Sequence, residues 1–386
     1  MKTSTRRLIH FAKVAAGDTM TRLLKALSRR GRGPSQRIRR VGQFAARHVE
    51  FRTVVPAVPL STLAPLYYAR GETERKYLDM MADVGDGMTP PAGIISASDI
   101  DVSLPIGMHR WRGRVFEEAL LGVEVLTNPK YALDLETIPY RPKARHGEAV
   151  LLTMPWHHNF YHWMIEILPR VMLIDRADDL KHLKLIVPNN APSFIRDSLT
   201  LAGCDHRVTF LDKGVHRFER LHIPSRLALT ADVSPFAIDW LNRRMPAGPL
   251  SGNRRIYISR ADARNRFVAN EAEVESVLRD FGFETVVLSN LGLHQQMNLF
   301  REAEFVVGSH GAGFAHLAFA RPGTRFIEFF EEGHFNRCFH QIAGVRGLDY
   351  GFLVGKRRGF GFDVDTRQLR DVMGQASGRN TAHGQW

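Results

Sequence analysis

The chain of 386 residues has only two cysteines, Cys204 and Cys338. Two cysteines cannot build a disulfide scaffold or a cysteine-based zinc knuckle, and so low a content favours a reducing compartment. The sequence also has no run of the roughly 18–20 apolar residues that a membrane-spanning helix needs. Its first residues show no uninterrupted apolar segment before a small-residue cleavage site, so we expect no signal peptide.

The net charge of the chain is +13, but almost all of this net charge lies at one end. Residues 1–48 hold 13 of the 53 Lys and Arg residues and only one of the 40 Asp and Glu residues. The 40 bases and 39 acids that remain nearly cancel. A nucleic-acid-binding domain would need a basic face of its own, so we expect no nucleic-acid partner.

Residues 1–40 have two interpretations. Apolar residues recur there at helical spacing among the bases, which predicts an amphipathic helix on an anionic membrane surface. The apolar positions are Leu8, Phe11, Ala12, Ala15, Leu23 and Leu27. The very basic stretch 29–40 fits a disordered leader equally well. The first interpretation predicts a cytoplasmic protein held peripherally at the inner membrane face.

Strand and helix patterns alternate from Glu148 onwards, which is typical of an α/β protein with parallel sheets. A polar stretch rich in Pro and Gly, residues 242–255, separates two such series. We therefore predict two facing Rossmann-like domains with a cleft between them. The predicted limits are a basic tail at 1–50, a first domain at 51–245, a second domain at 250–350 and a C-terminal extension at 351–386.

The stretch VVGSHGAGFAHLAFARPGTRFIEFF, residues 306–330, predicts a buried strand that ends at Gly308 and a helix that follows Gly311 and Gly313. Three interpretations compete for this turn. An esterase oxyanion loop would need a G-x-S-x-G sequence downstream, and the chain has none. A plain packing turn stays open. The third is an anion site, because backbone N–H groups at a helix start beyond a parallel strand attract phosphate.

A second constellation lies in MPWHHNFYHWMIEILPR, residues 154–170. His158, His162 and Glu166 recur at intervals of four, which places them on one helix face. They predict a metal site of a hydrolase, or a general base His162 oriented by Glu166, or the reverse. A polar helix start with no chemical role is the remaining interpretation.

Four stretches in order resemble glycosyltransferase family 61, a group of inverting sugar transferases with the two-domain GT-B fold. They are NFYHWMIEILPR, YISRADARNRFVANEAEVESVLRDFGFE, QQMNLFREAEFVVGSHGAG and LAFARPGTRFIEFF, and the resemblance covers about residues 148–350. Bacterial members of this family are often labelled capsular polysaccharide biosynthesis proteins. The sequence departs from the family pattern at Gln295, where Glu is usual, and at His316, where Asn is common.

The resemblance implies a nucleotide-sugar donor in the second domain and a polysaccharide or glycolipid acceptor in the first. Residues implied to hold the donor are Arg260, Arg266, His310, Gly311, Ala312, Gly313 and Glu328. The arginines would pair with the diphosphate, the 310–313 turn would cradle it, and Glu328 would accept from ribose hydroxyls or face solvent as a plain strand residue. His162 or Glu166 would be the base, with no metal and no cofactor. A metal-dependent hydrolase and a non-catalytic nucleotide- or glycan-binding protein remain alternatives.

Overall fold

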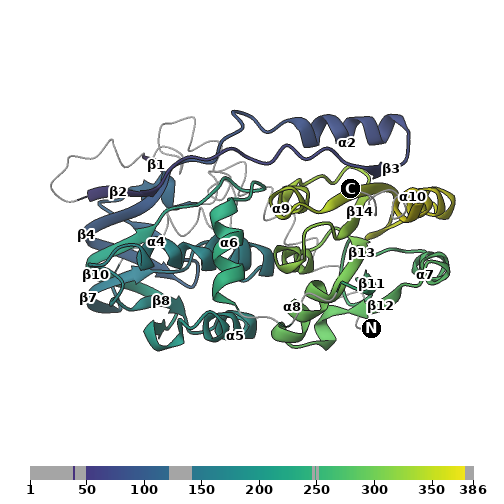
Figure 1. Cartoon of the computed structure of the whole chain (residues 1–386). Helices are drawn as coiled ribbons and strands as arrows, with labels where there is room; N and C mark the ends of the chain where they lie inside the picture. The colour runs from purple at the N-terminus through teal and green to yellow at the C-terminus, as the bar shows by residue number, and fades with distance from the viewer. Residues whose placement is uncertain (1–37, 40–48, 121–140, 246–247, 249–251, 379–386) are drawn as a thin grey trace.

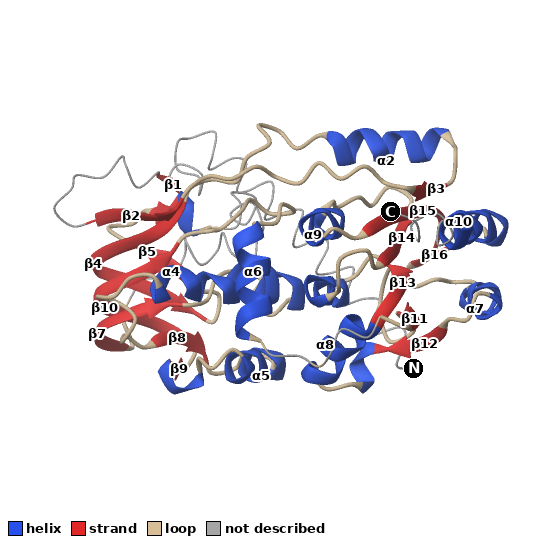
Figure 2. Ribbon diagram, in the orientation of Figure 1, coloured by secondary structure: helices blue, strands red, loops and turns tan. Residues whose placement is uncertain are grey.

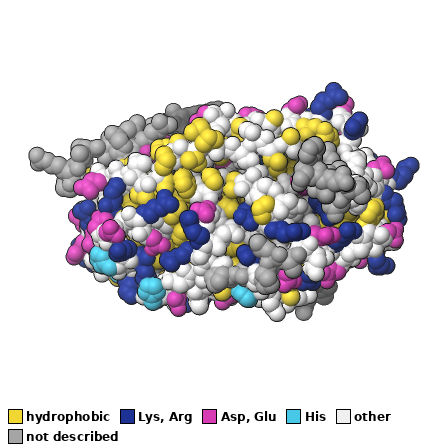
Figure 3. Space-filling view, viewed as in Figure 1, with side chains coloured by type: hydrophobic (Ala, Val, Ile, Leu, Met, Phe, Trp, Pro, Cys, Tyr) yellow, Lys and Arg dark blue, Asp and Glu magenta, His cyan; other side chains and the backbone are white. Residues whose placement is uncertain are grey.

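The computed structural model describes residues 38–39, 49–120, 141–245, 248 and 252–378. Two sheets stand at opposite ends of the molecule, and helices fill the space between them (Figures 1 and 2). The α/β class predicted from the sequence is confirmed. The predicted tail helix lies outside the described residues. On the face drawn in Figure 3, basic and acidic side chains are interspersed.

The first sheet has the strand order β2-β4-β10-β7-β8-β9, with β5 beside β4. Its strands are β2 (Val49–Val55), β4 (Ala92–Leu104), β5 (Met108–Arg110), β7 (Ala144–Leu151), β8 (Leu185–Pro188), β9 (Val208–Leu211) and β10 (Gly214–Pro224). Strands β10, β7, β8 and β9 are parallel, whereas β2, β4 and β10 pair antiparallel. A separate pair joins β1 (Ile38–Arg39) to β6 (Val115–Phe116).

The second sheet has the order β12-β11-β13-β14-β15-β16. Its strands are β11 (Arg254–Ser259), β12 (Glu284–Val287), β13 (Ala303–Ser309), β14 (Arg325–Glu331), β15 (Asp349–Arg358) and β16 (Gly361–Asp363). The first five are parallel, and only β16 runs antiparallel. This is the doubly wound order 2-1-3-4-5, in which the winding reverses between β11 and β13. Ligands of such sheets bind beyond the carboxyl ends of these two strands.

Helices cover the sheets in layers. The α-helices are α2 (Glu72–Ala82), α4 (Val171–Asp175), α5 (Ser193–Leu201), α6 (Pro235–Arg244), α7 (Glu271–Asp280), α8 (Leu293–Glu302), α9 (Cys338–Arg346) and α10 (Thr366–Gly378). Helices η3 (Glu117–Ala119), η6 (Leu168–Arg170), η7 (Asp205–Arg207), η8 (Leu288–Asn290) and η9 (Ala312–Phe319) are of the 3₁₀ type, and η5 (His162–Ile167) is a π-helix. One hydrophobic core runs from β7 and β8 through α4, α6 and α9 to β14. A second core packs α7 and α10 on the other face of the second sheet (Figure 2).

The N-terminal part of the chain crosses from the first sheet to the second. After β2 it forms β3 (Tyr67–Tyr68), which pairs with β15 at Gly351 and Phe352, and then helix α2. Residues 351–378 likewise continue the second sheet and its helical cover through β15, β16 and α10. The predicted domain limits stay a prediction. Strand pairing crosses them, because β3 of the predicted first domain and β16 of the predicted extension both belong to the second sheet.

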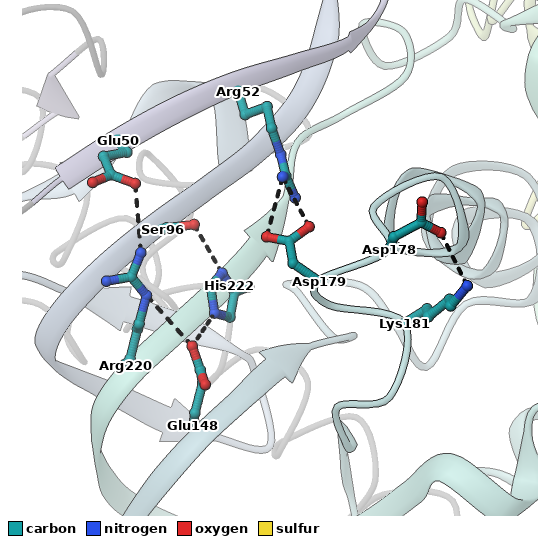
Figure 4. Close-up of polar contacts among 9 residues, drawn as sticks. All are labelled: Glu50, Arg52, Ser96, Glu148, Asp178, Asp179, Lys181, Arg220 and His222. Carbon is teal, nitrogen blue, oxygen red and sulfur yellow. Dashed lines mark hydrogen bonds and ion pairs between the residues drawn. The ribbon is translucent and has the colours of Figure 1, made fainter.

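A side-chain network ties four strands of the first sheet together (Figure 4). The imidazole of His222 on β10 contacts the Ser96 hydroxyl on β4 at 2.8 Å and the Glu148 carboxylate on β7 at 2.9 Å. Arg220 joins the same carboxylate to Glu50 on β2. These contacts join side chains of four neighbouring strands in the register that the backbone pairing gives.

One sequence-based detail is wrong. Asn270 and Glu273 predict a capping box at the start of α7, but the Asn270 side chain makes no capping bond to the helix backbone. Its amide instead accepts from the Val364 N–H and donates to the Val364 C=O, both at 2.9 Å. The side chain is engaged by a distant strand end, which local sequence spacing cannot reveal.

Acid is expected to destabilise the fold through two buried histidines. Burial lowers the pKa of His316 to about 3, and burial together with the charge of Arg170 lowers the pKa of His109 to about 3. The unfolded chain binds these protons near pH 6.5, so the free energy of unfolding should fall as the pH drops from 6.5 towards 3. Each histidine contributes about 1.4 kcal/mol per pH unit in that window. Urea unfolding across this range tests the slope, and an unchanged slope in the His316→Gln variant would contradict the assignment.

Candidate active site

A pocket of about 150 Å³ opens where the winding of the second sheet reverses. It lies beyond the carboxyl ends of β11 and β13, and Ser259, Arg260, Ser309, Gly311 and Gly313 line it. Three of the residues predicted to hold a donor are therefore brought together at the position where doubly wound sheets bind ligands. The segment that follows Gly311 is the 3₁₀ helix η9, which starts with Ala312 at the pocket.

Two partly buried guanidinium groups give this site its charge. Arg260 donates to the backbone carbonyls of Arg266 and Asn265, and Arg266 donates to Nε2 of His334 at 2.6 Å. Burial, followed by repulsion from Arg266, lowers the pKa of Arg260 to about 10, and burial also lowers the pKa of Arg266. In the described part of the chain, neither guanidinium forms an ion pair with a carboxylate. An anion bound here would relieve a repulsion that the protein itself leaves in place.

Gly311 is required by the position of Arg260. A Cβ atom at residue 311 would lie about 1.9 Å from Nη1 of Arg260, far inside contact distance. The backbone at Gly311 is extended, a conformation that any residue can adopt. The glycine is therefore needed for the close approach of the guanidinium and not for its backbone angles.

His310 lies beside the pocket, and the Glu328 carboxylate fixes the orientation of its ring. Its Nδ1 is 2.5 Å from Oε1 of Glu328, and Oε2 of the same carboxylate accepts from the Tyr350 hydroxyl at 2.8 Å. Glu328 is fully buried on β14. Glu328 therefore does not face solvent, and both of its carboxylate oxygens are already engaged, which leaves none for a ribose hydroxyl. The carboxylate holds His310 in place.

Sequence reasoning missed His334, Phe339 and Tyr350, which complete this part of the site. His334 accepts the Arg266 hydrogen bond and is kept neutral, because burial and the charges of Arg266 and His310 lower its pKa to about 4. The ring of Phe339 packs 4.8 Å from that of His310. Tyr350 comes from β15, one strand beyond the motif. Its only signal in the sequence is a tyrosine directly before the short apolar run at 351–354.

The second constellation forms on an unusual helix. Pro169 has no N–H to continue a regular helix, and the turn before it widens into the π-helix η5, in which the Leu168 N–H bonds to the Trp163 carbonyl. Within it, Nδ1 of His162 lies 2.5 Å from Oε2 of Glu166. π-Helical turns occur often at functional sites.

The two members of this dyad differ in exposure. The side chain of His162 is 18% exposed and that of Glu166 is 6% exposed. Because Nδ1 of His162 faces Glu166, its Nε2 is the ring nitrogen left for a substrate. Trp156 stacks on the His162 ring at 5.2 Å and has a backbone φ of 70°. A non-glycine residue in this region stores strain of the kind that clusters at active sites.

The two His–Glu dyads both lie near the start of α9. Tyr161, next to His162, packs edge-on against Phe339, which in turn contacts His310. Between the dyads lies Cys338, whose thiol pKa is raised by burial and then by the charges of Glu328 and Glu166. One site therefore draws residues from both halves of the molecule.

The predicted metal ligands are not brought together. His158 is exposed in the loop before η5, where its ring packs against that of His157. Across the described residues, no group of three or more His, Cys, Asp and Glu side chains is placed to hold a metal ion. His162 and Glu166 form a pair without His158, so the donor set of the hydrolase interpretation is not assembled.

The two departures from the family pattern have structural roles. Gln295 accepts from the Gly292 N–H at the start of α8, a capping position where Glu and Gln serve equally. His316 is fully buried and its Nε2–H donates to Gln296 at 2.7 Å, a bond that an asparagine amide could also donate. Neither residue lines the pocket. The non-catalytic interpretation thus loses the two sequence features that favoured it.

The sequence is similar to a known protein family and to several characterised proteins. Residues 160–327 match the family model described as Glycosyltransferase 61. An EGF domain-specific O-linked N-acetylglucosamine transferase of Bos taurus is 28% identical over 155 residues, 39% of this chain and 25% of that protein. The protein of that name in Mus musculus matches with the same identity and coverage. A beta-1,2-xylosyltransferase of Arabidopsis thaliana is 30% identical over 64 residues, 17% of this chain and 12% of that protein. The chain thus spans about a quarter of the N-acetylglucosamine transferases that it matches.

Proposed function

We propose, on the premise that residues 160–327 match the Glycosyltransferase 61 family, that the protein moves a sugar from a nucleotide-sugar donor to a glycan acceptor with inversion. The observation that carries the proposal is the pair of partly buried guanidinium groups at the reversal point of the second sheet. Arginine forks match phosphate geometry, and the N–H groups of Ala312 and Gly313 add donors. The two sheets with the site between them fit the GT-B arrangement.

The proposed reaction is a single displacement. The acceptor hydroxyl forms a bond to the anomeric carbon as the bond from that carbon to the diphosphate oxygen breaks. The hydroxyl proton goes to Nε2 of His162, while Glu166 holds Nδ1. Arg260, Arg266 and His310 stabilise the charge of the leaving diphosphate, so we propose that transfer needs no metal.

The donor sugar and the acceptor are proposed at the level of class. The names of the relatives point to N-acetylglucosamine and xylose as the first donor sugars to test. For the acceptor we propose a polysaccharide or glycolipid, as in capsular polysaccharide biosynthesis.

A thermal-shift screen of UDP, GDP, ADP and CMP tests the nucleotide site. We expect one nucleoside diphosphate, in the presence of EDTA, to stabilise the wild type by about 2.7 kcal/mol when present at 100 times its Kd. The His310→Ala variant should show a much smaller shift. Parallel samples with Mn²⁺ report whether a metal adds to the affinity. No shift with any nucleotide, together with a loss of stability on chelation alone, would refute the proposal and favour the metal hydrolase.

We also propose that the protein works at the cytoplasmic membrane face, held by its basic residues 1–40. The net charge of the first 48 residues and a membrane-linked acceptor support this placement. Among the helices that the structure describes, none combines the length and the apolar character needed to cross a bilayer. Co-sedimentation with anionic vesicles should depend on these residues, and equal binding by a chain that begins at residue 49 would refute the role of the tail.

A further inference from the structure

The two dyads share one design but differ in whether the second carboxylate oxygen has a hydrogen-bond partner among the described residues. In each, Nδ1 of a histidine lies 2.5 Å from a buried carboxylate. Both oxygens of Glu328 are occupied, by His310 and by the Tyr350 hydroxyl. Glu166 has one oxygen on His162, and its other oxygen is buried without a hydrogen-bond partner among the described residues. A buried carboxylate needs a compensating cation, so each dyad must have a source for one.

The cation near Glu166 is Arg170, one helical turn further along the chain, and among the described residues the two side chains attract each other without a direct ion pair. Its side chain is only 3% exposed, and its Nε donates to the Glu166 carbonyl at 2.8 Å. Nη1 donates to the Pro224 carbonyl, and Nη2 is buried with no partner in the described part of the chain. Burial lowers the pKa of Arg170 to about 9, and the charge of Glu166 opposes this effect. Each residue thus has one buried polar atom without a hydrogen-bond partner among the described residues, Oε1 of Glu166 and Nη2 of Arg170.

Other titratable groups around this pair do not replace Arg170. Arg226 repels Arg170, and its own guanidinium donates to the carbonyls of Glu117 and Leu120. His109 lies near Arg170 but is kept neutral by burial and by that charge. Tyr161 and Cys338 face Glu166 from η5 and α9, and burial raises the pKa of both, so they are neutral. Asp232, which lies near Tyr161, is paired with Arg337.

We propose that Arg170 is a positioning residue that balances the buried charge of Glu166 and thereby leaves His162 neutral, as a base must be. This inference rests on the proposed function, because it explains how one dyad accepts a proton. Were the cation absent, His162 would become the partner of Glu166 by taking up a proton before substrate arrives. At the other dyad the charge of Arg266 acts on Glu328, and the Tyr350 hydroxyl occupies the second oxygen of that carboxylate.

The test is an NMR titration of the histidine Cε1 signals of the full chain, with the His162 signal identified by its loss in His162→Asn. Arg170→Met should raise the protonation midpoint of His162 by about one pH unit or more, a tenfold change in proton affinity. Arg170→Lys, which keeps the charge, should leave the midpoint near that of the wild type. Adding Glu166→Gln to Arg170→Met should restore it. An unmoved midpoint in folded Arg170→Met would overturn the proposal.

If Arg170→Met does not fold, Arg170→Gln, whose amide can still donate to a backbone carbonyl, makes the same test. The midpoint of His162 should again rise by about one pH unit. A midpoint that stays or falls would overturn the proposal. The titration needs no substrate, so its failure is distinct from a failure of the nucleotide screen. In an active enzyme, the acid limb of the pH–rate profile should move with the NMR midpoint.

Discussion

Replacing His162 with asparagine is expected to slow sugar transfer about 10²–10⁴ fold, the usual contribution of a general base. The reason is that Nε2 is the ring nitrogen of His162 left for a substrate, since Nδ1 faces Glu166. Nucleotide affinity should change little, because the nucleotide pocket is lined by residues of the second sheet. The measurement is kcat for nucleoside diphosphate release, together with the Kd of the nucleotide that the thermal-shift screen identifies.

His158→Asn is the matched control, because it makes the same substitution four residues earlier in the same segment. His158 is exposed and lies outside the dyad, so this variant should retain nearly all activity. An equal loss of activity in both variants, reversed by added metal, would instead support a site shared by His158 and His162. A His162→Asn enzyme with unchanged kcat would show that another group accepts the proton.

Gly311→Ala is expected to weaken nucleotide binding about ten- to a hundredfold while leaving the fold intact. The new methyl group would occupy the place of Nη1 of Arg260, and the guanidinium would have to leave its anchors on the 265–266 backbone. A lost hydrogen bond to a charged group costs about 1.5–3 kcal/mol. Titration of the nucleotide by calorimetry gives the change in affinity, and thermal unfolding without ligand reports the fold.

Gly147→Ala is the control for the glycine substitution. Gly147 lies in β7 with open space around the position of a Cβ, so the variant should bind nucleotide as the wild type does. The mechanism also predicts non-additivity. In a chain that already carries Arg260→Ala, the Gly311→Ala change should cause little further loss. A full additional loss would mean that Gly311 acts through something other than the guanidinium.

Much of the second half of the fold follows from local sequence patterns. The apolar stretches at β11, β13 and β14 are short and bounded by polar or glycine residues, so their strands are readable from sequence. The type and the first residue of a helix are harder to predict from sequence. The segment after Gly311 is a 3₁₀ helix, and the segment after His158 becomes a π-helix only from His162. Both depend on tertiary packing and on Pro169, which local propensity describes only in part.

The site could be predicted where its chemistry is adjacent in sequence. His162 and Glu166 are one turn apart, and Arg260, Gly311 and Gly313 each follow a strand that ends at the same sheet edge. The partners of Glu328 could not be predicted, because Tyr350 comes from the next strand and the carboxylate had no visible reason to be buried. Arg170 was visible only as the last residue of a motif. Its role depends on burial, which a sequence pattern does not report.

The pairing of β3 with β15 also has a consequence for how the molecule is made. Tyr67 emerges from the ribosome early, whereas its partner Gly351 is synthesised near the end of the chain. The early strand must stay unpaired until almost all of the protein exists, so the second sheet cannot be completed before the end of translation. Long-range pairing of this kind slows folding and prolongs the exposure of unpaired, aggregation-prone strand edges. We therefore expect a protein whose yield in cells depends on chaperones more than on its final stability.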